Sequence, residues 1–169
     1  WPDMAAALRA SATPLWALES GTPVRDFDVV GVTLPHELAA AAILGVLDLS
    51  GIPLRADERR DEHPLVLGGG AWTTHAAAVE PCFDALFVGD GEAALPALVR
   101  EVGLARRRGE NRRAILERLG ARPEILVPAL RGTEHPGARA RRRFVRELPD
   151  SRPFASGPVG GLAPVFDRV

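Results

Sequence analysis

Three short apolar segments, each followed at once by a polar or glycine-rich turn, constrain the fold of this chain most. They cover residues 28–34, 64–67 and 85–88, and their apolar residues follow one another without polar alternation. Uninterrupted apolar runs of this length are typical of parallel strands that are buried on both faces. Segments with helical spacing follow at 36–49 and 94–102. We therefore expect an α/β domain in which the three strands are neighbours in one parallel sheet.

Weaker patterns surround these three strands. Residues 2–10 favour a short helix, and residues 14–18 and 124–128 are apolar runs that favour short strands. A further helix is expected between Asn111, a typical N-cap residue, and Gly120, which ends it.

The two halves of the chain differ in composition. Residues 132–169 are rich in Pro, Gly and Arg, as linkers are, so we expect one domain over residues 1–131. Residues 1–98 contain 5 Arg and 14 acidic residues, whereas residues 99–169 contain 16 Arg and 8 acidic residues. The basic half either contacts an anion such as RNA, or is a solvated helix face followed by a tail.

Composition excludes several classes of protein. The single cysteine, Cys82, rules out a disulfide scaffold and an iron–sulfur cluster held by this chain alone. The longest apolar run, residues 38–47, has about half the length that a membrane helix needs, and no secretion leader opens the chain. We therefore expect a cytoplasmic protein without a membrane partner. The four histidines lack metal-ligand spacing and no catalytic set stands out, so neither catalytic nor metal-ligating residues are assigned.

The expected ligand site lies where the three strands end. Parallel strands end at one edge of a sheet, and ligands of such folds bind in the crevice at that edge. The turns that follow the strands should therefore converge there. These turns contain the candidate cofactor-binding residues Thr33, Leu34, Gly68, Gly69, Gly70, Gly89, Asp90, Gly91 and Glu92.

Each of these groups also has a purely structural explanation. Glycines 68–70 either let a bulky ligand approach the backbone or simply form a tight turn. Asp90 and Glu92, at the start of a helix, either cap it or accept hydrogen bonds from a cofactor. The Thr33 hydroxyl bonds either its own helix start or a ligand. The glycines match neither GxGxxG nor a P-loop, which disfavours a dinucleotide or ATP site.

Two segments resemble the cobalamin-binding domain that precedes the barrel of many radical SAM enzymes. The first is Pro64-Leu-Val-Leu-Gly-Gly-Gly70, and Phe83-Asp-Ala-Leu-Phe-Val-Gly-Asp-Gly-Glu92 follows it at the spacing that this family shows. Earlier stretches, among them Gly31-Val-Thr-Leu-Pro-His-Glu-Leu38 and Leu47-Asp-Leu-Ser-Gly-Ile-Pro-Leu54, are similar to one bacterial subfamily. The resemblance covers nearly the whole chain and is most specific over residues 18–92.

The resemblance implies a flavodoxin-like, Rossmann-like three-layer sheet that is incomplete at its N-terminus. The first strand and helix of the family would precede Trp1, and the catalytic barrel, the expected partner in cis, would follow residue 169. Cobalamin would bind at the sheet edge, where the glycine turn and the alanines 39–42 leave room for its nucleotide tail. The 4Fe–4S cluster and S-adenosylmethionine would belong to the barrel. The segment Pro164-Val-Phe-Asp-Arg-Val169 is similar to the strand just before the barrel's cluster motif.

The sequence departs from the family in several places. Ala71 and Ala76-Ala77 replace a usual Pro and a later Pro-Glu pair, and Thr33 replaces a serine but keeps the hydroxyl. The axial-histidine motif DxHxxG of cobalamin mutases is absent here, as it is from many radical SAM relatives. Three functions stay open: a cobalamin-binding module of a radical SAM enzyme, a cobalamin-free scaffold with the same fold, and an RNA- or partner-binding module.

The expected incompleteness has a consequence for the strand at residues 28–34. In the flavodoxin strand order, the first strand lies beside it, so its absence leaves one edge unpaired. Unpaired apolar edges favour aggregation. We expect the chain on its own to be poorly soluble or to dimerise through this edge, and the upstream segment to cure this.

Overall fold

The computed structural model describes residues 2–145, and the structural statements below concern that part of the chain. Its helices are α1 (Pro2–Ala10), α2 (Ala40–Leu49), α3 (Leu95–Arg107) and α4 (Arg112–Leu119). Its strands are β1 (Val29–Thr33), β2 (Leu65–Gly69), β3 (Ala85–Phe87) and β4 (Ile125–Leu126). Residues Ala71–Ala78 form short 3-10 turns that are interrupted by a kink at His75 and Ala76. Trp1 and residues 146–169, with most of the predicted linker and the segment 164–169, lie outside the described residues.

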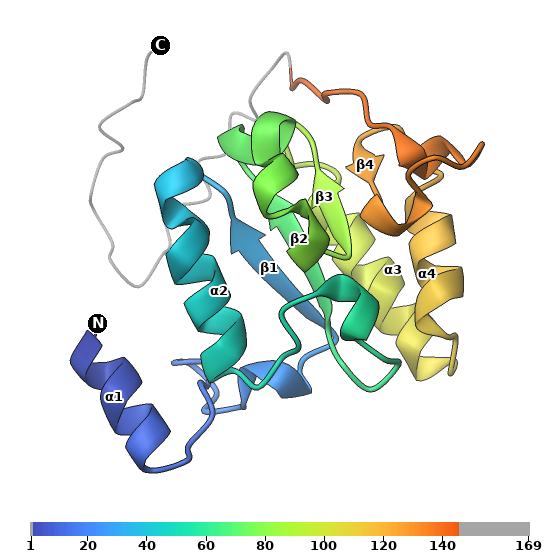
Figure 1. Ribbon diagram of the computed structural model, residues 1–169. Helices are drawn as coiled ribbons and strands as arrows, with labels where there is room; N and C mark the ends of the chain where they lie inside the picture. Colours follow the sequence, from blue (N-terminus) through green and yellow to red (C-terminus); the bar gives the residue numbers. More distant parts are fainter. Residues whose placement is uncertain (1, 146–169) are drawn as a thin grey trace, which may run out of the picture.

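The four strands form one sheet in the order β1-β2-β3-β4 (Figure 1). β1 pairs with β2, and β2 with β3, in parallel, whereas β4 is antiparallel to β3. The predicted arrangement of the three apolar runs as parallel neighbours is thus confirmed. The domain has the α/β, flavodoxin-like three-layer architecture that the sequence predicts.

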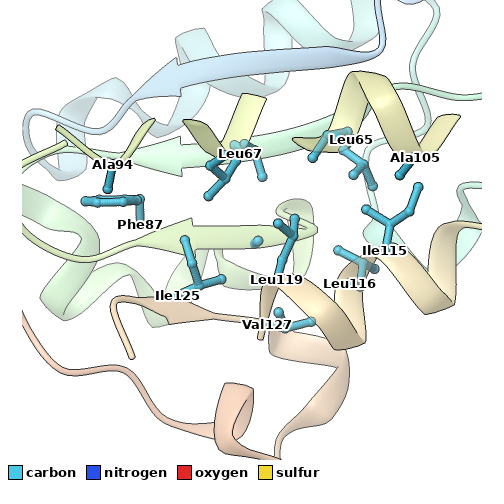
Figure 2. Packing of buried hydrophobic residues seen from close by; sticks show 13 residues of the cluster. Leu65, Leu67, Phe87, Ala94, Ala105, Ile115, Leu116, Leu119, Ile125 and Val127 are labelled. Carbon is cyan, nitrogen blue, oxygen red and sulfur yellow. The ribbon is translucent and has the colours of Figure 1, made fainter. Parts of the chain in front are cut away.

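Side chains of successive strand residues alternate between two hydrophobic clusters, one on each face of the sheet. Leu65, Leu67 and Phe87 point toward α3 and α4, where they pack with buried residues of both helices (Figure 2). Val66, between Leu65 and Leu67, and Leu86, directly before Phe87, pack on the opposite face, which α2 covers. Burial of each such large apolar side chain stabilises the fold by about 1.5–3 kcal/mol.

Local predictions around the sheet have mixed outcomes. The strand expected over residues 14–18 does not form. The segment folds back on itself, and Trp16 makes only an isolated bridge with Pro23. It is bonded to the end of α2 instead, because the Leu15 N–H donates to the Leu49 carbonyl at 2.8 Å. The helix expected over 36–49 begins as a 3-10 turn over Glu37–Ala39, without a side-chain cap, and becomes α-helical at Ala40. The short strand expected over 124–128 is β4.

The helix expected between Asn111 and Gly120 is α4. Asn111 is its N-cap, and the Asn111 Oδ1 accepts a hydrogen bond from the Ala114 N–H at 2.8 Å. Gly120 ends the helix with a right-handed φ of −65°, so it is not needed for a left-handed turn. A Cβ at this position would lie 3.1 Å from the Cα of Gly137, which explains the glycine by close packing.

β1 is the outermost strand on one side of the sheet and, within residues 2–145, pairs only with β2. This agrees with the unpaired edge predicted for residues 28–34. Large apolar side chains are exposed on helical segments of both faces of the sheet: Leu38 and Val46, before and on α2, are 83% and 38% exposed, and Leu95 and Val99, on α3, are 40% and 42% exposed.

The first part of the predicted linker packs against the domain. The Val127 N–H donates to the carbonyl of Gly137, and the Arg141 N–H donates to that of Pro123. Figure 1 shows this orange segment crossing the upper end of the sheet. No helix within residues 2–145 has the length and apolar character needed to cross a lipid bilayer.

Candidate functional site

The carboxyl ends of β1, β2 and β3 bring the nine predicted residues to one edge of the sheet. Thr33, the last residue of β1, lies opposite Gly69 of β2, and Gly69 lies opposite Phe87 of β3. The Leu34 N–H donates to the carbonyl of Gly69 at 2.6 Å. Because the three strands are parallel, the turn from Gly89 to Glu92 leaves the same edge. The geometry predicted for the edge is therefore present, while the roles of its residues stay predictions.

Two glycines of the 68–70 turn are needed by the fold itself. A Cβ on Gly68 would lie 2.5 Å from the Leu86 Cδ2, inside the core. Gly70 has a φ of +115°, and a Cβ there would lie 2.8 Å from the carbonyl oxygen of Leu34. Close packing and a left-handed backbone thus explain both residues without a ligand.

Gly89 and Asp90 hold the segment that crosses the end of β3. A Cβ on Gly89 would lie 2.1 Å from the carbonyl oxygen of Arg143. The Asp90 N–H donates to this oxygen at 3.1 Å, and the Asp90 carboxylate accepts the Val145 N–H at 2.8 Å. Neither a helix cap nor a ligand is required to explain these two residues, and sequence reasoning missed their partner because it lies more than fifty positions away.

The open part of the edge faces α3. Val29 packs in the α3 cluster, whereas Val30 and Val32 pack in the α2 cluster, so Gly31 and Thr33 point to the α3 face. Gly69 lies on this face as well, because it alternates with Gly68, whose Cβ would enter the α2 cluster.

Among residues 2–145, a Cβ on Gly31 or on Gly69 would meet no atom within 4 Å, and neither residue has a positive φ. The fold therefore demands no glycine at these two positions. Together with the exposed Thr33, they leave a wall of the sheet that is almost free of side chains.

A hollow of about 530 Å³ lies at the start of α3. Its lining residues are Gly91, Glu92, Leu95, Pro96 and Val99. Phe87 connects the two regions, since it pairs with Gly69 and its ring would lie 3.9 Å from a Cβ on Gly91. Within residues 2–145, the N–H groups of Gly91 and Glu92 donate no hydrogen bond. The hollow thus offers apolar contacts, one exposed carboxylate and two backbone donors.

Comparison with known proteins adds one finding. Residues 1–128 match the model of the family described as radical SAM proteins, N-terminal. The chain belongs to this family. No curated protein and no solved structure matches it significantly.

The radical SAM N-terminal domain has a second cavity at the opposite end of the sheet. This cavity of about 800 Å³ lies between α4 and the loops before β2 and β3. Its floor includes Asp84, which directly precedes β3 and is 2% exposed.

Asp84 is the centre of a buried ionic network. Its Oδ2 lies 2.9 Å from the Arg59 Nη1 and 2.7 Å from the Arg112 Nη2, and it accepts the Val66 N–H at 2.7 Å. Arg59 donates further to the carbonyls of Pro53, Leu54 and Cys82, and Arg112 to those of Arg60, His63 and Pro64. Burial lowers the pKa of Arg59, and the charge of Asp84 opposes this. All these groups have partners, so the network joins the loops rather than offering free ligands.

This network was not predicted from the sequence. The signal that was available is an acidic residue directly before a buried strand, because a charge at such a position requires a partner. Within residues 2–145, no three His, Cys, Asp or Glu side chains lie close enough to hold a metal ion.

Proposed function

We propose that this radical SAM N-terminal domain binds cobalamin at the open, α3-facing part of its sheet edge. The observation that carries the proposal is the pair of glycines, Gly31 and Gly69, that the fold itself does not require. A side chain of ordinary size at either position would occupy space on the wall next to Thr33. The resemblance of residues 64–92 to cobalamin-binding domains supports this choice of cofactor, and the family to which the chain belongs supports an association with radical SAM proteins.

The residues present fit the cofactor in size and chemistry. Pockets for drug-sized ligands have about 300–1,000 Å³, so the hollow of about 530 Å³ suits the nucleotide tail rather than the whole corrin. Leu95 and Val99 would contact apolar parts of the tail. The N–H groups of Gly91 and Glu92 would donate to its phosphate or amide oxygens, while the Thr33 hydroxyl and the Glu92 carboxylate would bond amide groups of the ring.

The alanines 39–42 belong to a different face. Ala39 and Ala40 pack against the α2 cluster, on the side of the sheet away from Gly69. The room expected from these alanines therefore does not adjoin the wall, and the proposal assigns the tail to the α3 face alone.

In the whole protein, we propose that the domain of residues 1–131 continues through a linker to a radical SAM barrel. The barrel would hold the 4Fe–4S cluster and S-adenosylmethionine, and cobalamin, when bound, would carry a methyl group. This chain would supply placement of the cofactor and exclusion of water, with no catalytic residue of its own.

A cobalamin-free scaffold with the same fold is the second candidate. It is favoured by the use of Gly89 and Asp90 to hold residues 143–145, which leaves less of the edge open. Ala71, and Ala76-Ala77, stand where the resembled family usually has a proline and a Pro-Glu pair, and these substitutions favour the same candidate.

Cobalamin retention separates the two candidates. The 169-residue chain is incubated with hydroxocobalamin, desalted, and its visible spectrum is recorded. Gly69→Leu should abolish retention while leaving the circular dichroism spectrum unchanged, because the new side chain enters open space next to Thr33. Gly45→Leu is the matched control: position 45 is also unobstructed, but it lies on α2, which covers the other face. An unliganded wild-type chain, or equal retention by both variants, would contradict the proposal.

A further inference from the structure

We propose that residues 139–144, called here the arginine segment, bind single-stranded nucleic acid beside the sheet edge. The segment reads Arg-Ala-Arg-Arg-Arg-Phe, and all five of its large side chains are exposed. Its arginines would contact phosphates, and Phe144 would stack on a base. This inference concerns a second surface and does not depend on cobalamin.

The arginine segment is held in place by the domain. The Arg141 N–H donates to the Pro123 carbonyl at 2.6 Å, and the Arg143 N–H donates to the Val88 carbonyl at 3.0 Å. Arg143 also forms a parallel bridge with Gly89. Its backbone is thereby fixed across the end of β3, as Figure 1 shows for the orange segment at the upper edge. A fixed backbone lowers the entropy that binding would otherwise cost.

The positive charge of this segment is largely uncompensated. Within residues 2–145, no carboxylate lies within 4 Å of a guanidinium nitrogen of Arg139, Arg141 or Arg142. Arg143 alone has such a neighbour, Glu124 at 3.7 Å.

Other arginines of the basic half are paired instead. Arg113 pairs with Glu117, Arg118 with Glu101 and Glu110, and Arg122 with Glu101. These pairs neutralise much of the surface of α4 and its C-terminal turn. Within residues 2–145, Arg100, Arg106 and Arg107 also have no carboxylate within 4 Å of their guanidinium nitrogens. The arginine segment differs from them in placing three such arginines within four consecutive residues, next to an aromatic ring.

An exposed aromatic ring lies within the same segment. Phe144 is 66% exposed, and the guanidinium carbon of Arg142 lies 5.0 Å from the centre of its ring. In an extended chain, residues two apart point to the same side, so Arg142 and Phe144 form one surface. Rings beside arginines are typical of single-strand binding, where bases stack and phosphates meet cations. A membrane would require a wider apolar face than one phenyl ring.

The test measures the affinity of the 169-residue chain for a fluorescein-labelled oligouridine of about 15 nucleotides. Fluorescence anisotropy is recorded at several salt concentrations. Arg141→Ser/Arg142→Ser should weaken binding about tenfold or more and reduce the slope of log K against log salt by about 1.4, or about 0.7 for each phosphate contact. Phe144→Leu should weaken binding about fivefold or more without a change in slope, because it removes stacking alone.

The matched control is Arg107→Ser/Arg108→Ser. It removes the same charge from two exposed arginines at the end of α3, beside the loops that precede the strands. Its affinity should stay within about twofold of the wild type. Arg141→Lys/Arg142→Lys restores the charge and should recover most of the binding and the salt slope, which separates lost contacts from lost folding.

Three results would overturn the inference. The wild-type chain fails to bind the oligouridine at low salt, the two double serine variants lose the same affinity, or Phe144→Leu binds as well as the wild type. Competition by polyglutamate or by anionic vesicles at equal charge concentration would likewise show a general polyanion surface and not a nucleic-acid site.

Discussion

The backbone of Arg143 passes so close to Gly89 that a Cβ on residue 89 would lie 2.1 Å from the Arg143 carbonyl oxygen. Gly89 also has a φ of +109°, a backbone conformation that residues other than glycine rarely adopt. One glycine thus allows both the turn after β3 and the attachment of residues 143–145. The arginine segment and the sheet edge are coupled through this contact.

Gly89→Ala should release the segment from the sheet. The loss combines backbone strain of about 1–3 kcal/mol with the steric conflict, so destabilisation should exceed that of a glycine with strain alone. Gly109→Ala is the control, because its φ is +72° but a Cβ there meets nothing within 4 Å. Hydrogen exchange should show faster exchange of the Arg143 amide in the Gly89 variant only. Unchanged protection of that amide would contradict the contact.

Asp84→Asn should destabilise the domain strongly. The change leaves Arg59 and Arg112 buried without their carboxylate, and breaking a buried ion pair in this way costs about 3–5 kcal/mol. Urea unfolding measures the effect. Asp57→Asn, which breaks the exposed pair with Arg55, should change the free energy of unfolding little. A similar urea midpoint for both variants would show that the network does not stabilise the loops before β2 and β3.

Sequence patterns predicted the sheet because its determinants are local. The apolar runs of β2 and β3 are continuous in the chain and buried on both faces, as their lack of alternation predicts. The same prediction is wrong for β1, none of whose residues is buried, because this strand lies at the side of the sheet. The N-cap at Asn111 was predictable for the same reason, since its partner is three residues away.

The site was predicted less well because its determinants are distant in sequence. The glycine spacing located the carboxyl ends of the strands. It did not show that close packing requires a glycine at positions 68 and 89, whereas the described residues allow a side chain at position 69. Leu86 and Arg143 make that distinction, and neither is implied by a glycine motif. The ionic network at Asp84 was missed because its partners lie about 25 residues away on either side.

The thiol of Cys82 should react slowly near neutral pH. Burial raises its pKa above the ordinary value of 9.0, and the nearby charges of Arg59 and Arg55 oppose only part of this. Since the thiolate is the reactive form, iodoacetamide labelling should be slower than for free cysteine and should accelerate only at higher pH.

The same shift affects stability. A raised thiol pKa gives a contribution to stability that is complete below the ordinary pKa and is lost as pH rises through the folded-state value. The free energy of unfolding should therefore fall above about pH 9, and less so in Cys82→Ser, which has no group that titrates there. Labelling as fast as that of free cysteine would contradict the assigned burial.

The free edge of β1 should drive self-association of the 169-residue chain. Within residues 2–145 this strand pairs only with β2, so the backbone groups on its other side have no strand partner. Unpaired backbone groups that become buried cost about 1–3 kcal/mol each, so pairing with a second copy relieves them. We expect dimers or larger species in size-exclusion chromatography.

A lysine on β1 tests whether this edge is the contact. Gly31→Lys adds charge at an exposed position where a Cβ meets nothing, and it should shift the chain toward monomer because edge lysines oppose strand pairing. Gly45→Lys adds the same charge on α2 and should leave association unchanged. The polypeptide extended by its upstream segment should be monomeric, since that segment is expected to supply the neighbouring strand. A wild-type chain that is monomeric and melts cooperatively would show that β1 needs no such neighbour.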